Sequence, residues 1–325
     1  MQAFVNDQLN ELWDQFASAY ADDVLIYTDE DDGDTHFDQV EEVIYRLHRA
    51  ELQGDIKKSR FNVTTVDYLG MVMEAGKGVR IDPEKIKAIL SWKVEDITTK
   101  SALRSFLGLC NYVRTFCHHA SDVAEPLNRL LKKDVPFEMG PDQIMAFEEM
   151  KKLATTAPVL AFFVPGRPTK VETDASRNAT GGLIFHLQEN GTWKPVGYFS
   201  KTMTPTERAY PIQDRELLAV VQTLEHYEPE LLGTKFFVVT DHQALLYWST
   251  KRLLSTRQVR WSDFLANFDI TFQYRRGQDN IAADALSRKT VGTPTVKARE
   301  QEDRTFPLIP PEKIDHQISA VHLQS

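Results

Sequence analysis

The 325-residue sequence contains few cysteines and no long apolar run. Its two cysteines, Cys110 and Cys117, are too few for a disulfide framework, which fits a reducing compartment. No run of about 18 apolar residues occurs, so we expect no membrane-spanning helix. The first residues lack a basic start followed by an apolar stretch, so we expect no secretory signal and an intracellular protein.

The sequence also lacks net positive charge, which at first argues against a nucleic-acid partner. Its net charge is −9, but residues 22–42 hold ten Asp or Glu and no Lys or Arg, so the remainder of the chain carries about +1. Residues 251–276 hold six Lys or Arg against two Asp, a local charge of +4. Because phosphate contact needs local positive charge, nucleic-acid binding stays open, and a solvated helix face explains the arginines equally well.

Length and periodicity predict two or three domains. A hydrophobic content of 42% and an aromatic content of 10% suffice for cores. In the first half we predict helices at 4–13 and 35–53, hairpins at 16–28 and 61–82, and mostly helix from 83 to 156. Pro158, Pro165 and Pro168 mark a boundary. Beyond it we predict strands at 169–174, 181–188, 193–201, 235–241 and 270–274, and helices at 212–227, 243–249, 256–267 and 279–287. Strands followed by alternating helix and strand indicate an α/β sheet with helices on its faces.

Four acids in the second half fall where these strands and helices could bring them together. They are Asp174 in the first strand, Glu216 on the first helix, Asp241 at the end of the fourth strand, and Asp284 on the last helix. Hydrolysis of a phosphodiester by two metal ions needs several carboxylates around one spot, and Asp and Glu suit hard cations such as Mg²⁺ or Mn²⁺. Any one of these acids alone is more simply an ordinary surface residue. We expect Gly181 and Gly182 to let backbone segments approach closely.

The segments around these acids resemble a known family. T-D-A-S, D-R-E-L-L-A-V-V, V-V-T-D-H-Q-A-L and Y-R-R-G-Q-D-N-I-A-A-D-A-L-S-R resemble the ribonuclease H domain of gypsy-type (Ty3-like) LTR retrotransposon reverse transcriptases. The resemblance extends over residues 3–289 and implies that Asp174, Glu216, Asp241 and Asp284 bind two Mg²⁺ or Mn²⁺ ions. It also implies endonucleolytic cleavage of RNA in RNA–DNA hybrids. Gln243 and Arg276 stand where the family often has Lys and Pro.

The same resemblance assigns nucleic-acid contacts. The stretch L-S-T-R-Q-V-R-W resembles the family's hybrid-contacting segment, so Arg257 and Arg260 would contact phosphates, and Trp261 is more simply a core residue. We place Arg275 and Arg276 in the same group. RNA–DNA hybrid, RNA and DNA are the expected partners, with other pol-derived chains or a second copy as further candidates and no membrane. Retroelement proteins act in cytoplasmic particles and nuclei, and the sequence does not decide between these locations.

Residues 20–23, Y-A-D-D, resemble the palm signature of reverse transcriptases, so Asp22 and Asp23 would bind Mg²⁺ for nucleotidyl transfer. The family's polymerase site needs a third acid from an upstream palm strand, and the 19 residues before Tyr20 read as a helix. We therefore expect polymerase activity to belong to the parent protein and to be absent here. A hairpin-turn pair is the structural alternative for Asp22 and Asp23, and a partner chain that supplies the missing half would restore the polymerase.

The sequence therefore predicts an α/β and α+β multidomain protein. We expect a partial palm at 1–82, a helical thumb and connection at 83–157, a ribonuclease H-like mixed five-stranded sheet with flanking helices at 158–289, and a disordered tail at 290–325. The rival hypothesis is a catalytically inactive, nucleic-acid-binding remnant of a decayed element.

A zinc site is the weaker hypothesis for the cysteines and their histidine neighbours. Cys110, Cys117, His118 and His119 lack paired C-x₂-C spacing. The two cysteines fall seven residues apart on an apolar helix face, so we predict that both are core residues.

Overall fold

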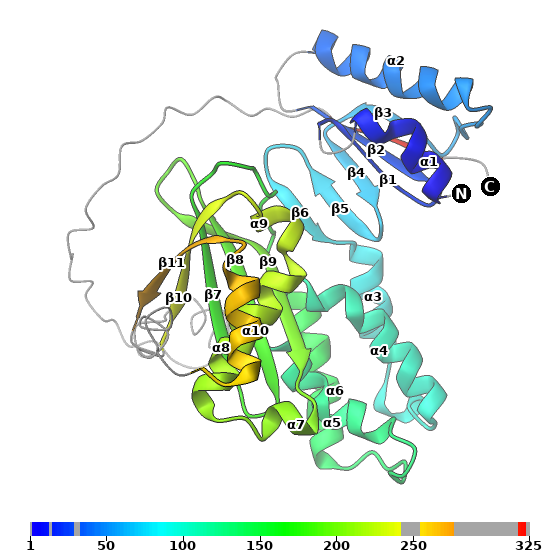
Figure 1. Cartoon of the computed structure of the whole chain (residues 1–325). Coiled ribbons are helices and arrows are strands. Elements are labelled where there is room, and N and C mark those ends of the chain that lie inside the picture. Colours follow the sequence, from blue (N-terminus) through cyan, green and yellow to red (C-terminus); the bar gives the residue numbers. More distant parts are fainter. Residues whose placement is uncertain (1, 13–14, 29–32, 242–253, 276–317, 323–325) are drawn as a thin grey trace.

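The computed structural model describes residues 2–12, 15–28, 33–241, 254–275 and 318–322, and Figure 1 shows their arrangement. An N-terminal region with two small sheets is followed by a group of helices and then by a five-stranded sheet with its own helices. This mixed α/β and α+β architecture confirms the predicted fold class. Within the described residues no helix is both long and apolar enough to cross a membrane.

The N-terminal region contains the predicted hairpin that carries Asp22 and Asp23. Strands β1 (Ala17–Tyr20) and β2 (Asp23–Tyr27) pair antiparallel, with Tyr20 opposite Asp23. Helices α1 (Gln2–Leu9) and α2 (Gly33–Arg49) and the 3₁₀ turn η1 (Asn10–Leu12) accompany the hairpin. Val5, Leu9, Val24, Ile26 and Val43 form the buried core between them.

One strand of this first sheet comes from the far end of the chain. Strand β12 (Ile318–His322) lies between β2 and β3 (Arg60–Val63), antiparallel to both, in the order β1-β2-β12-β3. The prediction of a largely disordered tail at 290–325 missed this strand. Its backbone gains partners on both edges, a long-range pairing that local composition does not reveal. Residues 290–317 lie outside the described residues.

The second small sheet departs from the predicted single hairpin over 61–82. Strands β4 (Thr65–Tyr68), β5 (Met71–Glu74) and β6 (Gly78–Ile81) form an antiparallel meander, so the expected turn at Gly76–Gly78 is present but a second turn precedes it. Leu69 and Gly70 make that turn with φ of 51° and 75°. Two positive φ angles suit a tight hairpin turn, but leucine rarely adopts a positive φ, so the turn signal at Leu69 is weak.

Helices α3 (Pro83–Ser91), α4 (Lys100–Arg114), α5 (Ala120–Leu130) and α6 (Pro141–Thr156) form the middle region, with the 3₁₀ turn η2 (Val94–Asp96) between α3 and α4. Thr99 caps α4 by accepting a hydrogen bond from the Ala102 amide. Phe106 and Phe147 are fully buried, with ring centroids 4.5 Å apart. Cys110 and Cys117 are buried, which confirms that they are core residues, and burial raises the pKa of both thiols to about 12.

The C-terminal sheet has five strands in the order β11-β10-β7-β8-β9. Strands β7 (Thr169–Ala175), β8 (Ala179–Leu187) and β9 (Trp193–Thr202) run antiparallel, whereas β10 (Lys235–Thr240) and β11 (Asp269–Tyr274) run parallel to β7. The helices are α7 (Pro205–Arg208), α8 (Ile212–His226), α9 (Glu228–Leu231) and α10 (Thr256–Leu265). The mixed five-stranded sheet is thus confirmed. The helices predicted at 243–249 and 279–287 lie outside the described residues.

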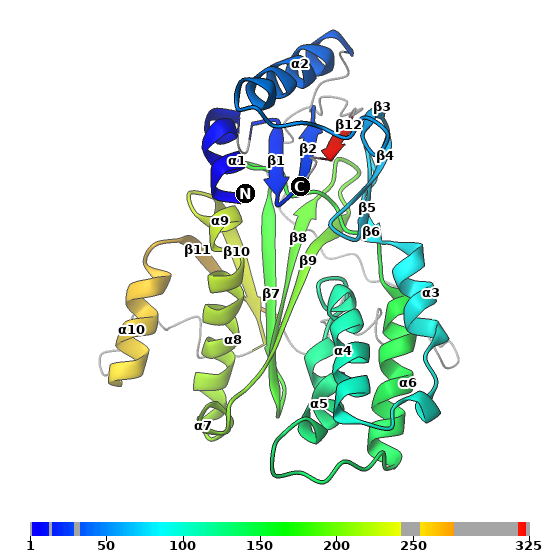
Figure 2. The same cartoon turned by 90° about the vertical axis from the view of Figure 1, so that its right-hand side faces the viewer.

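The two faces of this sheet are covered by different parts of the chain (Figure 2). Val171 and Ile184 on one face pack against α8. A Cβ at Gly182 would lie 2.2 Å from Thr223 Oγ1 of α8, so the glycine permits this close approach, as predicted. On the other face, Leu183, Phe185 and Tyr198 share one core with α4, α5 and α6. The regions predicted as 83–157 and 158–289 are therefore packed into a common interior, and their boundary stays a prediction.

Candidate functional site

Two of the four predicted acids come from neighbouring parallel strands. Asp174 lies in β7, and Asp241 directly follows β10. Val239 of β10 is opposite Glu172 of β7, so continuing the parallel register by two residues brings Asp241 level with Asp174. Parallel strands end at the same edge of a sheet, so the two carboxylates share that edge. Asp241 is exposed, and the Asp174 side chain is 45% exposed.

The third acid, Glu216, is contributed by α8 from the adjoining face. Its position one turn into the helix buries it to 8% exposure, and its Oε2 atom has no hydrogen-bond partner in the described part of the chain. Burial raises the pKa of Glu216 to about 8, and repulsion by Asp174 and Asp241 adds to the increase. A buried carboxylate with an unsatisfied oxygen is costly unless a proton or a cation compensates it.

The pKa of Asp174 is also shifted by its surroundings. Burial raises the pKa of Asp174, the His119 imidazole acts in the opposite direction, and repulsion by Asp241 raises it further. Asp174, Glu216 and Asp241 therefore interact as one acidic group drawn from β7, α8 and the end of β10. The fourth acid, Asp284, lies outside the described residues.

The donor set fits a divalent cation in chemistry, although its ligands are not gathered around a single point. Among the described residues, no three His, Cys, Asp or Glu side chains stand close enough together to hold a metal ion. This result is compatible with the mutual effect of the acids on their pKa values, because Coulombic repulsion acts over longer distances than metal ligation. The acids are close enough to repel one another but are not in contact. The unsatisfied Glu216 oxygen beside two further carboxylates is the observation that favours Mg²⁺ or Mn²⁺ here.

The arginines predicted to contact nucleic acid have different surroundings. Arg257 forms an ion pair with the buried Asp214 and lies 3.7 Å from the centroid of the Tyr210 ring. Arg260 is exposed on α10. Arg275 Nη1 lies 3.2 Å from Glu172 Oε1, with 38% of its side chain exposed. Arg276 lies outside the described residues. Arg260 is thus the most accessible of the three described arginines, and Arg257 has a structural partner.

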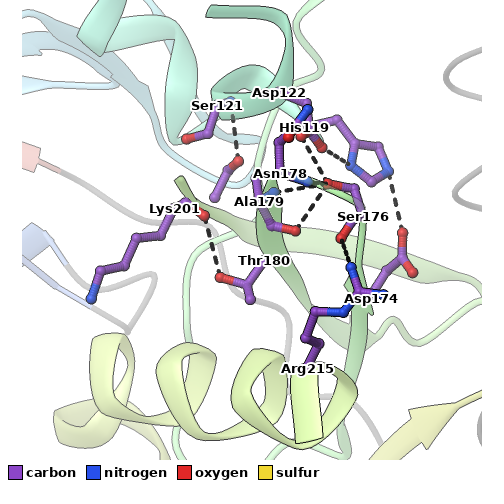
Figure 3. Close-up of polar contacts among 11 residues, drawn as sticks. His119, Ser121, Asp122, Asp174, Ser176, Asn178, Ala179, Thr180, Lys201 and Arg215 are labelled. Atoms are coloured by element: carbon purple, nitrogen blue, oxygen red, sulfur yellow. Dashed lines mark hydrogen bonds and ion pairs between the residues drawn. The ribbon is translucent and has the colours of Figure 1, made fainter. Parts of the chain in front are cut away.

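The structure also places a residue at the acids that the sequence analysis did not. His119, at the start of α5, has Nε2 at 3.7 Å from Asp174 Oδ2 and Nδ1 at 3.4 Å from Asp122 Oδ2 (Figure 3). We considered His119 only as part of a zinc site with His118 and the cysteines. No local pattern could connect it to Asp174, 55 residues away, because the contact depends on α5 packing against the sheet.

Asp22 and Asp23, the predicted palm acids, occupy the turn and the first residue of β2 and are half-buried. They belong to the N-terminal sheet, which is separate from the five-stranded sheet that carries Asp174. Mg²⁺ binding by Asp22 and Asp23 stays a prediction.

Comparison with known proteins identifies a domain family and several relatives. Residues 164–268 match the family described as "RNase H-like domain found in reverse transcriptase". Over 95% of its length the chain is 33% identical to the Transposon Tf2-3 and Tf2-4 polyproteins of Schizosaccharomyces pombe, and it spans 23% of their length.

Solved structures of foamy viral protease-reverse transcriptase share the fold. The complex of its dRH form with double-stranded DNA has a TM-score of 0.67 and 25% identity, with 84% of this chain and 48% of that chain covered. The complex with RNA/DNA hybrid has a TM-score of 0.66 and 24% identity, with 95% and 40% covered. Residues 164–268 are therefore an RNase H-like domain of the reverse transcriptase type, and over 95% of its length the chain is homologous to gypsy-type retrotransposon polyproteins.

Proposed function

We propose that this chain is a ribonuclease H that hydrolyses the RNA strand of RNA–DNA hybrids endonucleolytically. Asp174, Glu216, Asp241 and Asp284 would together hold two Mg²⁺ or Mn²⁺ ions. The observation that carries the proposal is the buried Glu216, whose carboxylate is opposed by burial and by two neighbouring carboxylates. This repulsion destabilises the folded chain, and a bound cation would compensate the negative charges that cause it. A strongly shifted pKa of this kind is typical of functional sites.

The acids cannot act on a phosphodiester without cations, because their negative charge repels the phosphate. When bound, the two divalent cations would supply an activated water and neutralise charge on the leaving oxygen. The protein's part is to hold the carboxylates on rigid elements. Asp174 lies within a central strand and Glu216 on a helix packed against it, so the ligands are fixed before substrate arrives.

The substrate class is inferred from the relatives and from the surface charge. One similar structure is a complex with RNA/DNA hybrid and another with double-stranded DNA. Arg260, which is exposed on α10, would contact a backbone phosphate, with Arg257, Arg275 and Arg276 as further candidates. A hybrid presents ribose on one strand only, so recognition of 2′-hydroxyls would select the strand that is cut.

A panel of end-labelled nucleic acids tests this proposal. The purified chain is incubated with Mg²⁺ or Mn²⁺ and an RNA–DNA hybrid, single-stranded RNA, double-stranded RNA or double-stranded DNA. We expect internal cuts in the RNA strand of the hybrid and little cleavage of the other three substrates. Binding of hybrid without cleavage in either metal would instead favour the inactive remnant.

We do not extend the proposal to polymerisation. Asp22 and Asp23 are the two acids that the resemblance assigns to a polymerase site, and two acids do not enclose two metal ions. We expect no primer extension on an RNA template by the chain alone, measured with labelled primer and all four deoxynucleotides in Mg²⁺. Robust extension, abolished by Asp23→Asn, would contradict this expectation.

A further inference from the structure

Four polar side chains are in contact with one another at the edge of the sheet: Asp174, His119, Asp122 and Ser176 (Figure 3). The His119 imidazole lies between two carboxylates, Asp174 on the Nε2 side and Asp122 on the Nδ1 side. The other oxygen of Asp122 accepts a hydrogen bond of 2.8 Å from Ser176 Oγ. Ser176 lies two residues after Asp174, in the turn that follows β7. The contacts through His119 and Asp122 therefore connect Asp174 to the turn next to it.

This turn is itself well ordered by hydrogen bonds. Ser176 Oγ accepts hydrogen bonds from the backbone amides of Asn178, at 3.1 Å, and Ala179, at 2.9 Å. Arg215, the neighbour of Glu216 on α8, donates to the Ser176 carbonyl at 3.3 Å. Ser176 is therefore held by hydrogen bonds within the turn that follows β7 and by a hydrogen bond from the helix that carries Glu216.

The beginning of α5 is fixed on the sheet by separate contacts. The Ser121 amide donates to Ser200 Oγ of β9 at 3.1 Å, and Arg114 of α4 donates to the Ser200 carbonyl at 2.6 Å. His118, the residue before His119, lies beside Gly181, which is opposite Asp174 in β8. A Cβ built at Gly181 would be 3.5 Å from His118 Nε2, an ordinary contact distance, so the close approach predicted at this glycine is absent. His119 thus approaches Asp174 from a helix end that has little freedom to move.

We propose that His119, oriented by Asp122, is a positioning residue for Asp174, and that the helical region before the RNase H-like domain thereby supplies one wall of the nuclease site. The inference deepens the proposed function and rests on it. It differs from the zinc hypothesis, because the imidazole contacts carboxylates and not thiolates. A metal-ligating carboxylate is commonly held by a second layer of polar groups, and loss of such a group costs about 10–100-fold in metal affinity or activity.

The test compares His119→Ala, Asp122→Ala and the conservative His119→Gln with His226→Ala. His226 is an exposed histidine ten residues beyond Glu216 on α8, about 15 Å along the helix, so it is a matched control. For each variant we would measure Mn²⁺ binding without nucleic acid, the Mg²⁺ concentration that gives half-maximal hybrid cleavage, kcat, KM for the hybrid, and Tm in chelator.

We expect His119→Ala and Asp122→Ala to weaken Mn²⁺ binding and raise the Mg²⁺ requirement by about 10–100-fold, with KM for the hybrid unchanged. His119→Gln should recover part of the loss, and His226→Ala should behave like the wild type. The double variant should lose little more than either single variant, since the two residues act as one unit.

Unchanged Mn²⁺ binding in His119→Ala at unchanged Tm would overturn the inference, as would an effect confined to KM for the hybrid. Mn²⁺ binding separates this inference from the proposed function. If the wild type binds Mn²⁺ but cleaves no hybrid, the function is wrong and His119 is still judged by binding. If the wild type binds no Mn²⁺, both proposals are wrong.

Discussion

Replacing Asp174 or Asp241 with asparagine is expected to reduce the rate of hybrid cleavage by at least about 100-fold, which corresponds to about 2.7 kcal/mol on the activation barrier. Each change removes one negative charge from the acidic group that surrounds Glu216 while preserving side-chain size. An amide is a poorer ligand than a carboxylate for a hard cation. Single-turnover cleavage of a labelled hybrid in saturating Mg²⁺ measures the effect.

A matched control guards against general loss of charge. Asp269→Asn changes an exposed acid at the first residue of β11, away from the acidic group, and should cleave at the wild-type rate. Both site variants should fold at least as stably as the wild type in chelator, because each removes a carboxylate that repels Glu216. Equal cleavage by wild type and both site variants would falsify the nuclease assignment.

Replacing Glu216 with glutamine is expected to stabilise the metal-free protein and to make its stability less dependent on pH. The pKa of Glu216 is raised from 4.5 to about 8 in the folded state. A raised pKa means that the folded chain retains a proton that the unfolded chain releases, so the free energy of unfolding falls as pH rises from about 4.5 to about 8. Glutamine stays neutral throughout this range.

The advantage of the variant should therefore be small near pH 5 and largest at pH 8 and above, where it could reach a few kcal/mol. Thermal unfolding in chelator from pH 5 to pH 8.5 measures it. Added Mg²⁺ should raise the Tm of the wild type at pH 8 more than that of Glu216→Gln, because ligand binding stabilises only the chain that binds it. Parallel Tm profiles for the two proteins would show that Glu216 titrates normally.

Several local features could be predicted from sequence because they depend on short-range chemistry. The hairpin around Asp22 and Asp23, the strand that carries Asp174 and the helix that carries Glu216 are all present. The turn at Leu69–Gly70 was missed, because a leucine with positive φ gives little local signal. The pairing of Ile318–His322 with β2 was missed as well, since strand partners far apart in sequence leave no trace in local periodicity.

For this protein, the sequence by itself determined the resemblance to retrotransposon polyproteins, the four acids to propose as a site and the alternation of strands and helices, since these follow from motif and periodicity. Only the tertiary structure decided what surrounds the acids. The common core of α4–α6 with Leu183, Phe185 and Tyr198 brings the start of α5 to the sheet edge, and this places His119 beside Asp174. Burial by α8 and repulsion from two strand ends similarly raise the pKa of Glu216. Both effects arise from packing between distant segments, which no local pattern specifies.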